Sequence, residues 1–225
     1  MYELLTGYLF WLSLAVFFIG CLVRLVLYFL GLDWQLDRVA YTAHRFRGAK
    51  GAWRSIYKWL LPFGTRSWRQ HPVMTFLFFG FHAGAILVPL FLLAHNTFLE
   101  HKIGISLFTL NTALADILTW MVIVTAFFLI LRRLALPQVR ILSTWSDYLI
   151  LVVAVAPFIT GLLARYEVSN YSFWLLTHIL CGELLLVLTP FTRLSHMVLF
   201  FASRAQLGMD FGIKRGGLRG TPITW

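Results

Sequence analysis

Charge, and acidic charge most of all, is scarce in this sequence of 225 residues. Nine Asp and Glu stand against nineteen Lys and Arg, and all charged residues together make up 12% of the chain. Hydrophobic residues make up 60%. A soluble domain of this length cannot bury so much apolar surface. The composition therefore excludes a soluble globular protein and predicts an integral membrane protein.

Cysteine is also scarce, because only Cys21 and Cys181 occur, each inside an apolar run. An iron–sulfur cluster takes about four ligands, so the chain cannot hold one by itself. We expect both thiols to pack as small apolar groups. The first apolar run is too long for the core of a signal peptide, which predicts a retained helix.

Apolar residues form five continuous runs, each near the ~20 residues that a helix needs to cross the hydrocarbon core. The runs are continuous rather than alternating, which favours helices over barrel strands. The predicted spans are 4–30, 72–94, 110–131, 147–164 and 173–196. We predict an all-α integral membrane protein, with a transmembrane domain over 1–196 and a basic tail over 197–225.

Basic residues alternate between the connections of these spans. The loop 31–71 has eight Lys and Arg, whereas the second-to-third and fourth-to-fifth connections have only Lys102 and Arg165. The positive-inside rule then places the N-terminus outside and the C-terminus in the cytoplasm. The same rule accounts for the net charge of +10 without nucleic acid as a partner. The tryptophan-rich loop 31–71 is either an interfacial helix on the lipid bilayer or a docking surface for a cytoplasmic partner.

Four of the seven histidines lie in, or at the ends of, only two spans. His71 and His82 are 11 residues apart, about 1100° of helix, and His178 and His196 are 18 apart, about 1800°. Both values are close to whole turns, which predicts one face for each pair. Because the two spans run in opposite directions, His71 is expected beside His196 at the cytoplasmic end. His82 is expected beside His178 toward the outside.

Two such imidazole pairs fit two b haems, because neutral imidazole is a good axial ligand inside a helical bundle. The alternative is that each histidine only hydrogen-bonds a neighbouring helix. Along a helix the 11-residue interval corresponds to a rise of ~16 Å and the 18-residue interval to a rise of ~27 Å. Helix tilt and a kink at Pro190 are expected to absorb the difference in height between the two pairs. Gly80, Gly84 and Gly182 let a flat macrocycle approach the backbone, or let helices pack closely.

Charged side chains within the spans have two interpretations each. Arg193 and Arg24 are expected either to pair with haem propionates or to anchor the chain at the membrane interface. Glu183 lies within a span, where a carboxyl group is costly, and is a candidate for a proton or quinone role. Asp116 lies near the outer end of its span, where it can also reach water.

Three motifs carry a family resemblance. They are FFIGCLVR in the first span, PQVRILSTWSDYLIL at the third-to-fourth junction, and PFTRLSH with the interval from His178 to His196 in the fifth. On these motifs, and over nearly the whole chain, the sequence resembles the gamma subunit of respiratory nitrate reductase and related dihaem cytochromes b.

The resemblance implies that His82 and His178 hold the outer haem, and that His71 and His196 hold the inner one. It also implies menaquinol or menaquinone bound near the outer haem, with Lys102 of LEHK at that site; the alternative for Lys102 is an ordinary loop lysine. Electrons then pass to or from a cytoplasmic iron–sulfur subunit, within a complex of further subunits in the inner membrane of a prokaryote. Such a chain is an electron-transfer subunit rather than a complete enzyme.

Several features depart from the nitrate reductase pattern. The fourth-to-fifth connection RYEVSNYS is short, Phe81 precedes His82, and the tail contains FGIKRGGLRG. These departures favour similarity to the cytochrome b subunits of quinone complexes from sulphate reducers, of the Tmc or Dsr type, whose partner resembles heterodisulfide reductase. A nitrate reductase gamma subunit is the alternative. From another class, a haem-free membrane anchor or small transporter also remains open, as does the direction of electron flow.

Overall fold

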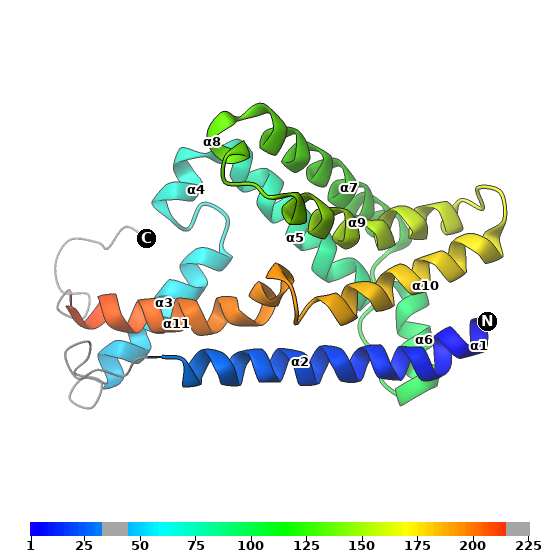
Figure 1. Ribbon diagram of the computed structural model, residues 1–225, viewed down its shortest axis with the longest axis horizontal. Coiled ribbons are helices and arrows are strands. Elements are labelled where there is room, and N and C mark those ends of the chain that lie inside the picture. Colours follow the sequence, from blue (N-terminus) through cyan, green and yellow to red (C-terminus); the bar gives the residue numbers. More distant parts are fainter. Residues whose placement is uncertain (33–44, 215–225) are drawn as a thin grey trace. The chain divides into compact units, whose positions relative to one another are not determined.

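The computed structural model describes residues 1–32 and 45–214, in which every regular element is a helix (Figure 1). Five of these helices are long and apolar enough to cross a membrane. They are Tyr2–Leu30, Pro72–Phe91, Thr112–Ala135, Trp145–Arg165 and Tyr171–Leu188. The predicted all-α fold with five spans is therefore confirmed, and by length and composition the chain is a multi-pass membrane protein. The direction in which the termini face stays a prediction.

The five spans are joined by shorter helices. The first span consists of α1 (Tyr2–Leu4), a π-helical turn (Leu5–Leu9) and α2 (Phe10–Leu30). The others are α5 (Pro72–Phe91), α7 (Thr112–Ala135), α9 (Trp145–Arg165) and α10 (Tyr171–Leu188). The shorter elements are α3 (Arg45–Leu60), α4 (Arg66–Gln70), α6 (Leu93–Ile103), α8 (Pro137–Arg140), the 3-10 turn Arg193–Ser195 and α11 (His196–Lys214).

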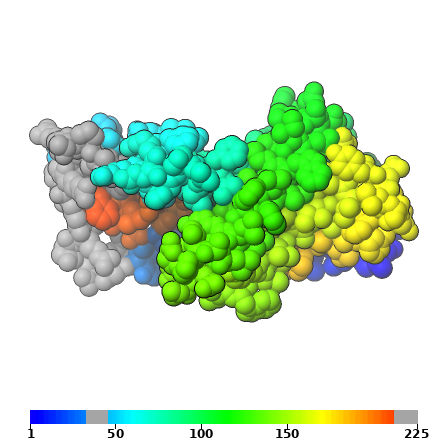
Figure 2. Space-filling view, turned by 90° about the horizontal axis from the view of Figure 1, so that it is seen from above, coloured from blue at the N-terminus to red at the C-terminus, as the bar shows by residue number. Residues whose placement is uncertain are grey.

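The first of two compact units combines residues 1–9 with 76–185. In this unit α7 and α9 pack against each other, and their side chains meet in the space-filling view (Figure 2). The buried core consists of Val88 from α5, Leu118 and Val122 from α7, and Phe158 from α9. A Cβ added to Gly84 lies only 2.5 Å from a methyl group of Val122, so the close approach of α5 to α7 requires glycine there.

The second unit contains residues 10–75 and the chain from residue 186 onward. Here α3 packs along α11, and α2 also contacts α11. Gly208 of α11 lies so close to α3 that an added Cβ is 2.4 Å from the carbonyl oxygen of Gly51. Ser55 is fully buried, and the Arg204 guanidinium lies 4.5 Å from the centroid of the Trp59 ring. Within the predicted basic tail 197–225, the chain is helical as part of α11 up to Lys214, and the rest of the tail lies outside the described residues.

The structure corrects the helical continuity on which the histidine spacings depend. His71 follows α4 as its C-cap residue, with φ −126° and ψ 66°, and α5 begins only at Pro72. A residue before proline is disfavoured in helical conformation, which explains the boundary. The span that contains His178 ends at Leu188, before Pro190, whose ring cannot continue a helix. The assumption of one continuous helix is therefore wrong for both histidine pairs, and the shared face stays a prediction.

The connection predicted as an outer loop also contains a helix. The second span ends at Phe91 rather than residue 94, and Leu92 adopts an extended conformation with ψ 133° before α6 begins. Asn96 of α6 is 1% exposed and donates to the carbonyl of Phe108 at 3.2 Å. Its Oδ1 accepts from the N–H of Leu107 at 3.3 Å. Asn96 thereby fixes α6 against the segment that leads into α7.

The motif at the third-to-fourth junction caps a helix. Thr144 precedes α9, and its backbone N–H donates to the carboxylate of Asp147 at 2.9 Å. The Thr144 hydroxyl donates to the same carboxylate at 3.0 Å, and Asp147 is buried. An acidic residue in the first turn also interacts favourably with the helix dipole. This pair therefore starts the fourth span at a defined residue.

Candidate functional site

Two histidine rings lie against each other in the first unit. His95 belongs to α6 and His178 to α10, and their ring centroids are 5.8 Å apart with an angle of 12° between the ring planes. Both side chains are half-buried. His95 follows the predicted second span 72–94 and was expected in the connection to the third span, without a functional role. The periodicity of the sequence carried no signal for its contact with His178, because the contact depends on the extended residue Leu92 between α5 and α6.

Backbone carbonyls fix both rings in the same way. Nδ1 of His95 lies 3.0 Å from the carbonyl oxygen of Pro89, and Nδ1 of His178 lies 2.8 Å from that of Pro157. A carbonyl only accepts, so each Nδ1 carries the proton and each Nε2 keeps its lone pair. Burial, and then the charge of His178, lower the pKa of His95, while the Pro89 carbonyl opposes this. His95 is therefore held as neutral imidazole, the form that binds metals.

The backbone around these rings is shaped to place them. Gly161 of α9 faces the ring of His178, and a Cβ there is 3.1 Å from both Cε1 and Nδ1. Such a contact is tighter than most side chains tolerate, so glycine gives the imidazole its room. At its far end, α6 is terminated by Gly104, whose φ of 71° is a left-handed conformation that favours glycine.

His82, the predicted partner of His178, lies on α5 with different neighbours. Its ring centroid is 4.2 Å from that of Phe78 and 5.4 Å from that of Phe81. Nδ1 of His82 lies 2.8 Å from the carbonyl oxygen of Phe78, so Nε2 is again the nitrogen with the lone pair. His82 thus has the tautomer of an axial ligand. Its pairing with His178 stays a prediction.

The predicted inner pair lies in the second unit, where both side chains are exposed. Nδ1 of His196 lies 2.9 Å from the carbonyl oxygen of Arg193, the first residue of the 3-10 turn. Pro190 packs onto α2, where a Cβ added to Gly20 is 2.6 Å from the proline ring. Two of the resemblance motifs, FFIGCLVR and PFTRLSH, therefore meet at this contact. The pairing of His71 with His196 stays a prediction.

The other residues expected near a haem have mixed surroundings. Gly80 and Gly84 both face α7, where an added Cβ on Gly80 is 3.4 Å from Met121. Gly182 of α10 has no atom within 4 Å of an added Cβ, so its surface is open. Arg24 and Arg193 are exposed. Their roles toward propionates stay predictions.

Two candidates for a quinone site lie in the first unit. Glu183 of α10 has one carboxylate oxygen that is buried without a hydrogen-bond partner among the described residues. Lys102 lies on α6, seven residues after His95, which is about two turns along the same face. The Lys102 amino group is 5.7 Å from the ring centroid of Phe98, which lies between them on that face. One face of α6 therefore carries the imidazole of His95, the aromatic ring of Phe98 and the ammonium group of Lys102.

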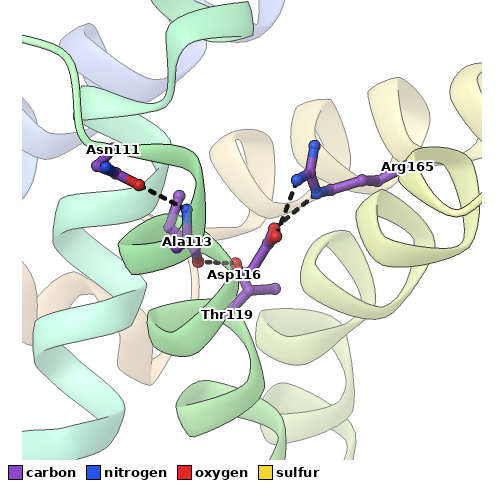
Figure 3. Close-up of polar contacts among 6 residues, drawn as sticks. Asn111, Ala113, Asp116, Thr119 and Arg165 are labelled. Atoms are coloured by element: carbon purple, nitrogen blue, oxygen red, sulfur yellow. Dashed lines mark hydrogen bonds and ion pairs between the residues drawn. The ribbon is translucent and has the colours of Figure 1, made fainter.

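Sequence reasoning missed an ion pair between two spans. Asp116 of α7 lies 2.6 Å from Nε of Arg165 at the end of α9, and Nη2 donates to the other carboxylate oxygen at 2.8 Å (Figure 3). Near this pair, Asn111 caps the start of α7 by accepting from the N–H of Ala113 at 2.8 Å. The signal was present, because the acid and the base stand at ends of antiparallel spans that are expected on one side of the membrane.

Within residues 1–32 and 45–214, no group of three or more His, Cys, Asp or Glu is placed to hold a metal ion. A pair of imidazoles such as His95 and His178 suits a haem iron, because the porphyrin supplies the four remaining ligands.

The fold and the paired imidazoles define the class as an all-helical multi-pass membrane protein with a half-buried histidine pair between α6 and the span α10. The chain is 56% identical, over 226 residues and 100% of both chains, to a protein of Nitratidesulfovibrio vulgaris strain Hildenborough whose name describes no function. The chain belongs to the family of that protein. No family model and no solved structure matches it.

Proposed function

We propose that this protein is a membrane cytochrome b that transfers electrons between menaquinone or menaquinol and a cytoplasmic iron–sulfur subunit of a respiratory complex. The observation that carries the proposal is the imidazole pair of His95 on α6 and His178 on the span α10, with ring centroids 5.8 Å apart. A histidine within a membrane is costly, and two in contact point to a ligand that needs both. When bound, two b haems supply one-electron transfer through the membrane.

The tautomers of the histidines support axial ligation. Five histidines are candidates for the four axial positions of two haems, and four of them, His82, His95, His178 and His196, have Nδ1 within 3.0 Å of a backbone carbonyl oxygen. Histidines that bind a metal through Nε2 almost always hold Nδ1–H in this way, because the second bond fixes the ring and raises its basicity. The sequence proposes His71 as a further ligand beside His196.

The quinone is proposed to bind beside α6. Oxidation of a menaquinol releases two electrons and two protons, and reduction of a menaquinone takes up the same number. The Lys102 ammonium donates a hydrogen bond to a quinone oxygen, and Phe98 offers an apolar surface next to it. The buried, unpartnered oxygen of Glu183 is proposed as a proton acceptor or donor on the other helix that carries the histidine pair.

The proposal is tested on the purified full-length chain by reduced-minus-oxidised absorption spectroscopy and by the haem content per chain. The account predicts b-type bands and two haems. A featureless spectrum contradicts the account and favours a haem-free anchor or transporter.

The quinone site is tested separately by the exchange of electrons between a menaquinol analogue and the haems. Lys102→Ala is expected to slow this exchange at unchanged haem content. Lys50→Ala, which removes an exposed lysine of α3, is the matched control. Equal rates for both variants contradict the role of Lys102.

A further inference from the structure

The distance between the His95 and His178 rings fits two ligands of one metal. A transition metal binds an imidazole nitrogen at about 2.0–2.1 Å, and the ring centre lies about 1 Å behind that nitrogen, so two imidazoles on opposite sides of one ion have centroids roughly 6 Å apart. The observed separation is 5.8 Å. Direct packing of two rings also gives such a separation.

The hydrogen bonds favour ligation over packing. Each ring donates Nδ1–H to the carbonyl oxygen of a proline, Pro89 or Pro157, from a different helix or helix end. Within the described residues neither Nε2 has a hydrogen-bond partner. Nε2 is therefore the nitrogen that each ring has left to bind a metal ion.

Contacts of the neighbouring backbone also hold the two rings in position. Asn96, next to His95, ties α6 to the following segment through two hydrogen bonds. A Cβ added to Gly161 is only 3.1 Å from the His178 ring, so the absence of a side chain at this position makes room for the imidazole. Metal ligands in general are oriented by such supporting contacts.

From this geometry we propose that His95, and not His82, is the axial partner of His178 at the haem expected on the outer side. This inference rests on the proposed function, because it assumes that His178 binds a haem iron. It replaces the partner that the sequence assigned from the histidine spacing in the second span. It also brings the iron within two helical turns of Lys102 along α6, which shortens the path between the proposed quinone site and the haem.

The test compares His178→Ala, His95→Ala and His82→Ala in the full-length protein, with haem content and a redox titration as readouts. His178→Ala and His95→Ala are expected to lose the same haem component, and His82→Ala is expected to keep that component. His101→Ala is the matched control, because it removes an exposed histidine from the last turn of α6. The inference is overturned if His95→Ala keeps both haems or if His82→Ala loses the component that His178→Ala loses.

A second variant covers the case in which His95→Ala does not fold. His95→Met keeps a side chain that binds haem iron, and replacing His by Met as axial ligand raises the reduction potential. The expected result is a raised potential, or the loss, of the component that depends on His178. Unchanged potentials of both haems overturn the inference. If the wild-type chain binds no haem at all, the proposed function fails; if it binds two haems that are indifferent to His95, only this inference fails.

Discussion

Replacing Asn96 by alanine tests whether one side chain holds α6 in place. The Asn96 side chain is 1% exposed, and it bonds the Phe108 carbonyl at 3.2 Å and the Leu107 N–H at 3.3 Å. Asn96→Ala removes both bonds. Because Asn96 follows His95 in the chain, the orientation of the proposed ligand depends on the same contacts.

The magnitude follows from the two lost hydrogen bonds. Each is worth about 0.5–1.5 kcal/mol, so the closed state of the segment after α6 loses about 1–3 kcal/mol. Since 1.4 kcal/mol is a factor of about ten in an equilibrium constant, local opening becomes roughly 5- to 150-fold more frequent. The helices of the buried core do not share these hydrogen bonds. The protection of their backbone amides against hydrogen exchange is therefore expected to stay unchanged.

Hydrogen–deuterium exchange of the full-length protein in lipid nanodiscs measures this opening. Hydrogen exchange at the Leu107 amide is expected to accelerate roughly 5- to 150-fold, with little change in the exchange of the α7 amides. Asn111→Ala is the control, because it removes a comparable hydrogen bond, the one that the Asn111 side chain accepts from the Ala113 N–H at 2.8 Å. It is expected to affect the start of α7 instead. Unchanged exchange at Leu107 in the Asn96 variant refutes the reasoning.

Three further substitutions test other contacts of the two units. Gly161→Ala is expected to displace the His178 imidazole by a few tenths of an ångström, which shifts the reduction potential of the haem. An unchanged potential contradicts this. Gly20→Ala is expected to lower thermal stability, because its Cβ lies 2.6 Å from the Pro190 ring; a neutral effect contradicts that packing. Asp116→Asn is expected to cost only about 0–1 kcal/mol, because the partly exposed pair with Arg165 is screened, and a much larger loss in thermal unfolding contradicts this.

The five spans were predictable because the length of an apolar run is a local property, set by the thickness of a bilayer. Their ends were less predictable, since single residues decide them. His71 lies outside α5 because Pro72 follows it, and His196 lies outside α10 because Pro190 intervenes. Both prolines are visible in the sequence, but the spacing argument assumed helices that run through them.

The neighbours of His178 were not predictable in the same way. The ring contact with His95 depends on the turn at Leu92, which reverses the chain into α6. Nothing in a periodic pattern specifies where a chain goes after such a turn. Gly161 was likewise unassigned, because its effect arises across two helices and not along one.

The central claim is that paired histidines of this chain hold haem iron, and a potentiometric titration of the purified full-length protein tests it most directly. The account predicts two b-type components in the absorption spectrum, of which His178→Ala retains one. A spectrum without b-type bands, or a His178→Ala variant that retains both components, contradicts the account.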